Sequence, residues 1–264
     1  MVDEGVALRS YGPAGWGFPM NPDEYDKMAE VEDRMWYYRA LHARLGDFLR
    51  RGLANTGAAR VLDAGCGTGG LLRRLEGEEP AWTLSGVDHS ALACSYAVRR
   101  TGADIREASV TALPFGAASF DGIVSADVLY QIERPVEALK EFYRCLRPGG
   151  VVVINVPAYR WLWSYHDEMV QSKHRFGRGE MIALMKEAGF AVERSTYWNT
   201  LPFPLVVVRR KLIRVRPSEG DVRMYPASVE AAFNAAMTLE RAWLRNVGGL
   251  PFGSSVLVVG RRSR

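Results

Sequence analysis

The sequence predicts an α/β protein built on a mostly parallel sheet with helices on both faces. From residue 60 onward, short apolar runs alternate with stretches of helical periodicity, the pattern of strands joined by crossover helices. A glycine-rich segment, VLDAGCGTGG, begins in the first of these runs at residues 61–70. The chain has 264 residues with 48% hydrophobic content and 24% charge, which is typical of one large globular domain.

Seven segments have the composition of strands. RVLDAG and TLSGVD are the first two, and ADIREAS is the weakest because it is short and polar. The last, SSVLVVGRR, lies more than fifty residues after the sixth. The expected strands span residues 60–65, 83–88, 103–109, 121–127, 150–158, 191–199 and 254–262.

Helical periodicity accounts for most of the remaining chain. Apolar residues recur at helical spacing in 134–146 and again in 177–190, where Gly189 ends the predicted helix. A structureless loop from Leu201 to Gly253 would be unusually long, so we expect an insertion there, with a helix over 228–247. Residues 25–51 also have helical character. We therefore divide the chain into a helical region, 1–55, and a main domain, 56–264.

Composition excludes several classes of protein. Cys66, Cys94 and Cys145 show no C-x-x-C spacing, which argues against a disulfide framework and a zinc site and favours a reducing cytoplasm. No signal peptide and no membrane-spanning run is apparent. The formal net charge of +4 does not require a nucleic-acid partner.

The glycine-rich turn indicates a nucleotide-like ligand. Gly65, Gly67 and Gly70 fit G-x-G-x-x-G, while Gly65, Gly67 and Gly69 fit G-x-G-x-G, and no G-K-[ST] ending follows. The carboxylate of Asp63 would repel a pyrophosphate beside this turn but attract an ammonium group. Asp88, at the end of the second strand, is placed to accept hydrogen bonds from ribose hydroxyls, so it indicates a nucleoside.

Four segments in order resemble the class I S-adenosylmethionine-dependent methyltransferases. They are VLDAGCGTGG, LSGVDHS, ALPFGAASFDGIVSADVLYQI and LRPGGVVVINVPA, which together cover about residues 58–158. The resemblance implies a Rossmann-like, doubly wound, seven-stranded sheet whose last strand is antiparallel. It also implies S-adenosylmethionine as cofactor and S-adenosylhomocysteine as product, with no metal.

The resemblance also implies a set of cofactor-binding residues. The glycine turn would line the methionine and ribose, Asp88 would hold the ribose, and His89 would lie against the adenine. Ser109 occupies a place where many relatives have an acidic residue for the adenine amino group. The implied set is Asp63, Gly65, Cys66, Gly67, Gly69, Asp88, His89, Ser109, Val110, Ala126, Asp127 and Leu129.

The helical region before the main domain would form a lid, as the leading helix does in similar proteins. Its segment VEDRMWYYRALH packs three aromatic residues and Arg39 into one helical turn. Arg39 could pair with the methionine carboxylate, since guanidinium groups bind carboxylates in a bidentate way. An amphipathic helix with buried aromatic residues explains the same pattern equally well.

Residues 158–178 and 201–253 are the expected acceptor-side segments. The first follows the fifth strand at the carboxyl edge of the sheet, where doubly wound folds bind ligands, and it carries aromatic and titratable side chains. His166 is the first candidate for a general base and His174 the second, because imidazole titrates near neutral pH. Tyr130 is a candidate hydrogen-bond partner for the acceptor.

The second acceptor-side segment joins an apolar run to basic residues from Arg209 to Arg216. One interpretation is peripheral contact with an anionic membrane that presents a lipid acceptor. The other is a buried segment followed by a solvated basic stretch, which we favour.

The expected activity is methyl transfer to a small-molecule or lipid acceptor, most simply at oxygen. Transfer to nitrogen or carbon, or to a peptide or RNA, is an alternative, although SADVLY stands where nucleotide-base enzymes would favour N/D-P-P-Y/F. A protein that binds S-adenosylmethionine without transferring methyl is a second alternative. An NAD-dependent oxidoreductase is a distant third.

Overall fold

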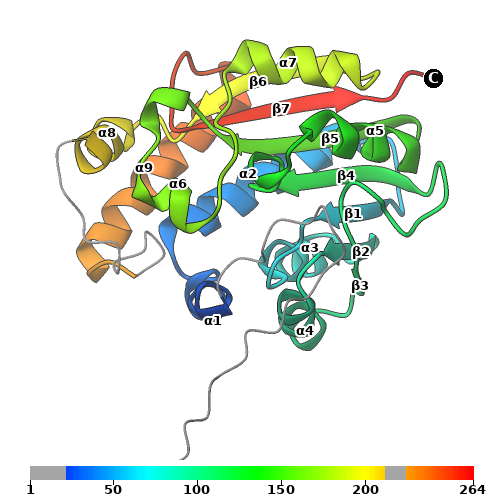
Figure 1. Cartoon of the computed structure of the whole chain (residues 1–264), viewed down its shortest axis with the longest axis horizontal. Helices are drawn as coiled ribbons and strands as arrows, with labels where there is room; N and C mark the ends of the chain where they lie inside the picture. The colour runs from blue at the N-terminus through cyan, green and yellow to red at the C-terminus, as the bar shows by residue number, and fades with distance from the viewer. Residues whose placement is uncertain (1–21, 212–223) are drawn as a thin grey trace, which may run out of the picture.

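The computed structural model describes residues 22–211 and 224–264 and contains a seven-stranded sheet in the order β3-β2-β1-β4-β5-β7-β6 (Figure 1). Strands β1 to β5 run parallel, and β7 runs antiparallel between β5 and β6. This arrangement confirms the predicted Rossmann-like sheet with an antiparallel last strand. The strands are β1 (Arg60–Ala64), β2 (Thr83–Asp88), β3 (Asp104–Glu107), β4 (Phe120–Ala126), β5 (Leu146–Pro157), β6 (Ala191–Trp198) and β7 (Ser255–Arg261).

Helices cover both faces of the sheet, because alternate residues of each buried strand point to opposite sides. Val151 and Val153 of β5 join one hydrophobic cluster with α2, α3 and α9, while Val152 and Ile154 join the other with α5 and α7. The helices are α1 (Pro22–Val31), α2 (Trp36–Gly52), α3 (Gly70–Glu78), α4 (Ala91–Arg100), α5 (Pro135–Cys145), α6 (Tyr165–Met169), α7 (Arg178–Glu187), α8 (Phe203–Lys211) and α9 (Ala227–Asn246).

The strand order reverses between β1 and β4. From β1 the chain moves outward through β2 and β3, and then returns to place β4 on the other side of β1. Connections that diverge in this way leave a crevice at the carboxyl ends of the strands, where ligands bind in doubly wound sheets. The glycine turn after β1 and the SADVLY segment after β4 both lie there.

The helical stretch expected over 25–51 is divided into α1 and α2. Helix α2 starts at Trp36, whose backbone N–H donates to Glu230 Oε2 of α9 over 2.8 Å. Glu32, in the intervening turn, accepts hydrogen bonds from Thr68 Oγ1 at 2.5 Å and Arg100 Nη1 at 2.7 Å. These tertiary partners stabilise a break that the local sequence does not mark. Residues 1–21 of the proposed helical region lie outside the described residues.

The segment between β6 and β7 contains α8 and α9. The predicted helix over 228–247 corresponds closely to α9, whereas α8 was not expected from the sequence. Glu240 of α9 is buried and accepts hydrogen bonds from Arg44 Nη2 at 3.0 Å and from the backbone N–H groups of Asn199 and Thr200. Arg44 also lies over the Trp198 ring, 4.6 Å from its centroid. These contacts attach α9 to α2 and to the end of β6.

No helix within 22–211 and 224–264 is long and apolar enough to cross a membrane.

Candidate functional site

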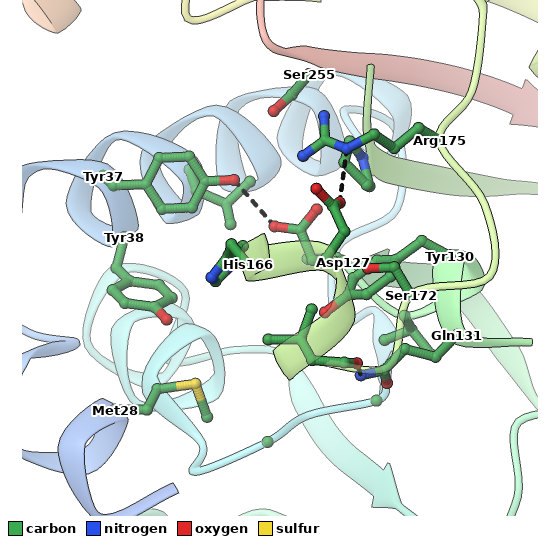
Figure 2. Close-up of a pocket in the computed structure, with 18 of the residues that line it drawn as sticks. Met28, Tyr37, Tyr38, Asp127, Tyr130, Gln131, His166, Ser172, Arg175 and Ser255 are labelled. Carbon is green, nitrogen blue, oxygen red and sulfur yellow. Dashed lines mark hydrogen bonds and ion pairs between the residues drawn. The ribbon is translucent and has the colours of Figure 1, made fainter. Parts of the chain in front are cut away.

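A cavity of about 1230 Å³ opens at the carboxyl ends of the central strands. Its walls come from the glycine turn, the ends of β2 and β4, the α1–α2 region, and the segments carrying α6, α8 and α9. Figure 2 shows part of its lining, with Tyr37 and Tyr38 on one side and Tyr130 and Arg175 on the other. Residues distant in sequence therefore line one cavity.

The turn after β1 needs its glycines. Gly65, Gly67 and Gly69 have φ angles of 91°, 52° and 87°, in the left-handed region that residues with a Cβ rarely adopt. A Cβ on Gly65 would also overlap Cγ2 of Val128. The turn thereby brings the backbone to the cavity wall, so a ligand can approach it closely.

Asp88 fixes the second strand end against this turn. Its Oδ2 accepts a hydrogen bond from Gly67 N at 3.0 Å, and its Oδ1 accepts one from Ser90 N at 3.0 Å. The hydrogen bond and charge of Asp88 raise the pKa of the neighbouring His89. Oδ1 also lies 3.4 Å from His89 Nδ1, whereas Oδ2 accepts only from Gly67 N among the described residues, so Oδ2 can also accept from a ribose.

Asp63 is a buried acid at the other side of the turn. Burial, and then the charges of Glu32 and Asp88, raise its pKa to about 8, and no hydrogen bond from a described residue offsets this. A buried carboxylate without a donor is destabilising unless a cation lies beside it. The ammonium group of an amino-acid ligand has the charge and the donors that Asp63 lacks.

Glu32 is a cavity residue that the sequence analysis did not identify. It comes from the turn between α1 and α2, is buried, and lines the cavity near the glycine turn. Its position depends on Thr68 and Arg100, which lie 36 and 68 residues away in sequence. No local motif signals such a contact.

The side of the cavity where the adenine is expected has a polar rim. Ser109 and Val110 both line it, as His89 does. The hydroxyl oxygens of Ser109 and Thr111 are 2.8 Å apart, and Ser109 Oγ also accepts from Thr111 N at 3.2 Å. Ser109 is therefore held in a local turn at the cavity wall.

Asp127 occupies the opposite half of the cavity. Its two oxygens accept hydrogen bonds from Tyr37 Oη at 3.0 Å and from Asn155 Nδ2 at 2.9 Å (Figure 2 shows the Tyr37 bond). Trp198 Nε1 donates to Asn155 Oδ1 at 2.6 Å, which orients that amide. Burial raises the pKa of Asp127 to about 6, and its φ is 54°. The carboxylate is thus held in one orientation at the end of β4.

The predicted acceptor segment 158–178 contributes two groups to the same half, His166 on the short helix α6 and Arg175, both of which line the cavity. Tyr130, which follows β4, lines it as well. Burial is the largest of the influences that raise the pKa of Tyr130, so its phenol stays protonated at neutral pH. Figure 2 places His166 between the Tyr38 side and Asp127.

Four predicted site residues do not line this cavity. Arg39 is exposed on α2, and Leu129 is fully buried in the core. Gly69 packs against α4, and His174 lines a smaller neighbouring pocket, with its Nε2 3.3 Å from Glu133 O. The other predicted residues that line the cavity are Asp63, Gly65, Cys66, Gly67, Asp88, His89, Ser109, Val110, Ala126, Asp127, Tyr130 and His166.

A family model for the methyltransferase domain matches residues 62–154, from β1 into β5. The malonyl-[acyl-carrier protein] O-methyltransferase of Enterobacter lignolyticus is 35% identical over 223 residues, which cover 81% of this chain and 86% of that protein. The ubiquinone biosynthesis O-methyltransferase of Paracidovorax citrulli is 34% identical over 151 residues, covering 52% of this chain and 62% of that protein.

Solved structures show the same fold. The geranyl diphosphate C-methyltransferase of Streptomyces coelicolor A3(2), in complex with Mg²⁺, geranyl diphosphate and S-adenosyl-L-homocysteine, superimposes with a TM-score of 0.58 at 17% identity. The match covers 85% of this chain and 78% of that one.

The sequence relationship to the Enterobacter lignolyticus protein extends through most of both chains, and the glycine turn, Asp63 and Asp88 provide a site suited to S-adenosylmethionine. The chain therefore belongs to the class I S-adenosylmethionine-dependent methyltransferases.

Proposed function

We propose that this enzyme methylates an oxygen atom of a small-molecule acceptor, with His166 as the proton acceptor. One observation carries the proposal: a single cavity joins the glycine turn and Asp88 to a half that holds His166, Asp127 and Tyr130. Two of the similar proteins are named O-methyltransferases, which supports oxygen as the target.

The cofactor supplies a methyl group already activated by a sulfonium. The acceptor oxygen forms the new bond to the methyl carbon as the carbon–sulfur bond breaks, and the proton of the acceptor hydroxyl passes to His166. This chain's residues align the acceptor and exclude water, which are the main contributions that such a displacement needs. Asp63 would receive the ammonium of the methionine moiety, and Asp88 the ribose hydroxyls.

We also propose that α1 covers the cofactor. Tyr25 and Met28 of this helix line the cavity, and a Cβ on Gly67 would lie 2.9 Å from Met28 Cε. The helix thus lies directly against the glycine turn. Helix α1 belongs to the expected lid, residues 1–55, whose described part also includes α2.

We propose more specifically that the acceptor is a lipid and that the enzyme meets it at a membrane surface. Leu205 and Val208 of α8 are 59% and 41% exposed, so the helix has an apolar outer surface. Arg209 and Arg210 line the cavity, and the rest of the basic stretch, apart from Lys211, lies outside the described residues. Co-sedimentation with anionic vesicles, compared with neutral vesicles, tests this contact.

Replacement of His166 tests the chemical proposal. For His166→Gln we expect kcat to fall by about 10²-fold or more, because proton transfer to a positioned base contributes that much. The affinity for S-adenosylhomocysteine, measured by calorimetry, should not change, since the side chain belongs to the acceptor half. Mass spectrometry of the product locates the methyl group, and a methyl on carbon or nitrogen would contradict oxygen transfer.

A further inference from the structure

Charge is divided between the two halves of the cavity. The cofactor half is acidic, with Asp63, Asp88 and Glu32, which suits a cofactor that bears an ammonium and a sulfonium. The acceptor half contains three guanidinium groups, those of Arg175, Arg209 and Arg210, beside the carboxylates of Asp127 and Asp167. The ammonium and sulfonium of the cofactor do not call for guanidinium groups.

Arg175 is the most firmly fixed of these cations. Its side chain is 3% exposed, Nε donates to Asp167 Oδ1 at 2.6 Å, and Nη1 donates to Ala158 O at 2.8 Å. No described residue accepts from Nη2, whose two N–H donors remain. Figure 2 shows the guanidinium pointing toward Tyr37 and Ser255. A buried guanidinium with unused donors therefore faces the acceptor half.

Asp167 lies between two of these guanidinium groups. Its Oδ1 accepts from Arg175, while its Oδ2 accepts from Arg210 Nη1 at 3.2 Å and from Ser164 N at 2.9 Å. Arg175 therefore shares this buried carboxylate with Arg210.

Apolar side chains that line the same cavity indicate what else the ligand contains. Leu205 and Val206 of α8, together with the Trp36 and Phe233 rings stacked at 4.7 Å, line the same cavity. An acceptor that fits has an apolar body and one anionic end. Guanidinium matches carboxylate and phosphate geometrically, so either group satisfies the free donors.

We propose that the acceptor carries an anionic group, a carboxylate or a phosphate, that binds Arg175 while its nucleophilic oxygen faces His166. The inference rests on the proposed function and narrows its substrate to amphipathic anions. The anionic group is a recognition element, distinct from the atom that receives the methyl group.

Calorimetry on the complex with S-adenosylhomocysteine tests this without turnover. The probes are benzoate, phenyl phosphate and benzamide, which share a ring and differ in charge. We expect at least one anion to bind on the order of tenfold or more tighter than benzamide, because charge-assisted hydrogen bonds are lost with the neutral probe. The two anions distinguish carboxylate from phosphate recognition.

Variants identify the residue responsible. Arg175→Gln should remove the preference for the anion and leave the affinity for S-adenosylhomocysteine unchanged. If this variant does not fold because Asp167 loses its partner, the double variant Arg175→Gln with Asp167→Asn removes both charges and should show the same loss. Arg160→Gln, at an exposed residue that lines only the smaller neighbouring pocket, is the matched control and should behave as wild type.

The outcomes separate this inference from the proposed function. Equal binding of benzamide and the anions, no saturable binding of either anion, or a preference retained without Arg175 would overturn it. The proposed methylation of oxygen would not be affected by that result, because the acceptor could be neutral. The His166→Gln variant would still test it. Conversely, anion binding through Arg175 together with methylation at carbon or nitrogen would contradict only the choice of oxygen.

Discussion

Two single residues of the cofactor half, Asp63 and Gly65, lie in environments that restrict which side chain can occupy the position. Asp63 is a buried acid whose pKa is raised to about 8 by burial and by the charges of Glu32 and Asp88. Gly65 has a φ of 91° and no room for a side chain beside Val128. Few other side chains would be tolerated at either position. Both positions lie where the cofactor is expected.

Replacement of Asp63 should change how stability depends on pH. The pKa of Asp63 is higher in the folded protein than in the unfolded chain, so its ionisation destabilises the fold as pH rises from about 4 to about 8. Asp63→Asn removes this loss, so urea denaturation should show the variant gaining at least about 1 kcal/mol relative to wild type between about pH 5.5 and about pH 8.5. Its affinity for S-adenosylmethionine should fall. A pH dependence parallel to that of wild type would contradict the assignment.

Replacement of Gly65 by alanine should both destabilise the protein and weaken cofactor binding. The positive φ and the overlap with Val128 together should lower the free energy of unfolding by about 1–3 kcal/mol. Gly57 is the control, because a Cβ there meets nothing within 4 Å and its φ lies outside the left-handed region. Equal unfolding curves for Gly65→Ala and Gly57→Ala would show that the turn tolerates a side chain.

At the scale of elements, α9 lines the cavity and also holds α2 and the end of β6 in place. Its Glu230 binds the first N–H of α2, and its Glu240 binds Arg44 of α2 and the backbone after β6. These contacts hold α2, and hence Tyr37, in place against Asp127. The insertion before the last strand is therefore part of the support for the acceptor half.

The buried Arg44–Glu240 pair allows a matched stability test. Both side chains are 1% exposed, so Glu240→Gln leaves a buried guanidinium without its counter-charge and should cost about 3–5 kcal/mol. In the exposed Arg106–Asp104 pair, Asp104→Asn should change the free energy of unfolding by no more than about 1 kcal/mol. Chemical denaturation measures both. A loss of similar size in the two variants would mean that Glu240 is not a structural anchor.

At the scale of the whole molecule, the cavity is assembled from segments spread along the described chain, from Tyr25 to Ser255. The glycine turn, the β4 end, α1, α6, α8 and α9 all contribute to its wall. A ligand that fills it therefore links segments that are otherwise held by separate contacts. Binding should stabilise the complete fold.

Thermal unfolding measures this coupling. S-adenosylhomocysteine at a hundredfold excess over its Kd should stabilise the protein by about 2.7 kcal/mol, since it binds the folded state alone. NAD at the same concentration is the control and should have no effect, because Asp63 disfavours a pyrophosphate beside the turn. A stabilisation by NAD as large as that by S-adenosylhomocysteine would contradict the selectivity.

The sequence by itself determined the sheet and the cofactor half. Most of the seven strands appear as apolar runs, although β3 is short and polar, and Gly65, Gly67 and Asp88 lie within or beside two of the apolar runs. Helix α8 and the break between α1 and α2 were not predicted, because local patterns do not encode the tertiary contacts that stabilise the break. A local motif predicts the structure of its own few residues and not their contacts with distant segments.

The tertiary structure alone decided the acceptor half. Tyr37 meets Asp127 across 90 residues of sequence, and Arg210 meets Asp167 across 43. The sequence analysis named His166 as the first candidate base and His174 as the second, and of these two only His166 lies in the main cavity. Side-chain direction depends on packing between distant elements, so it becomes defined only when the sheet, α2, α8 and α9 assemble.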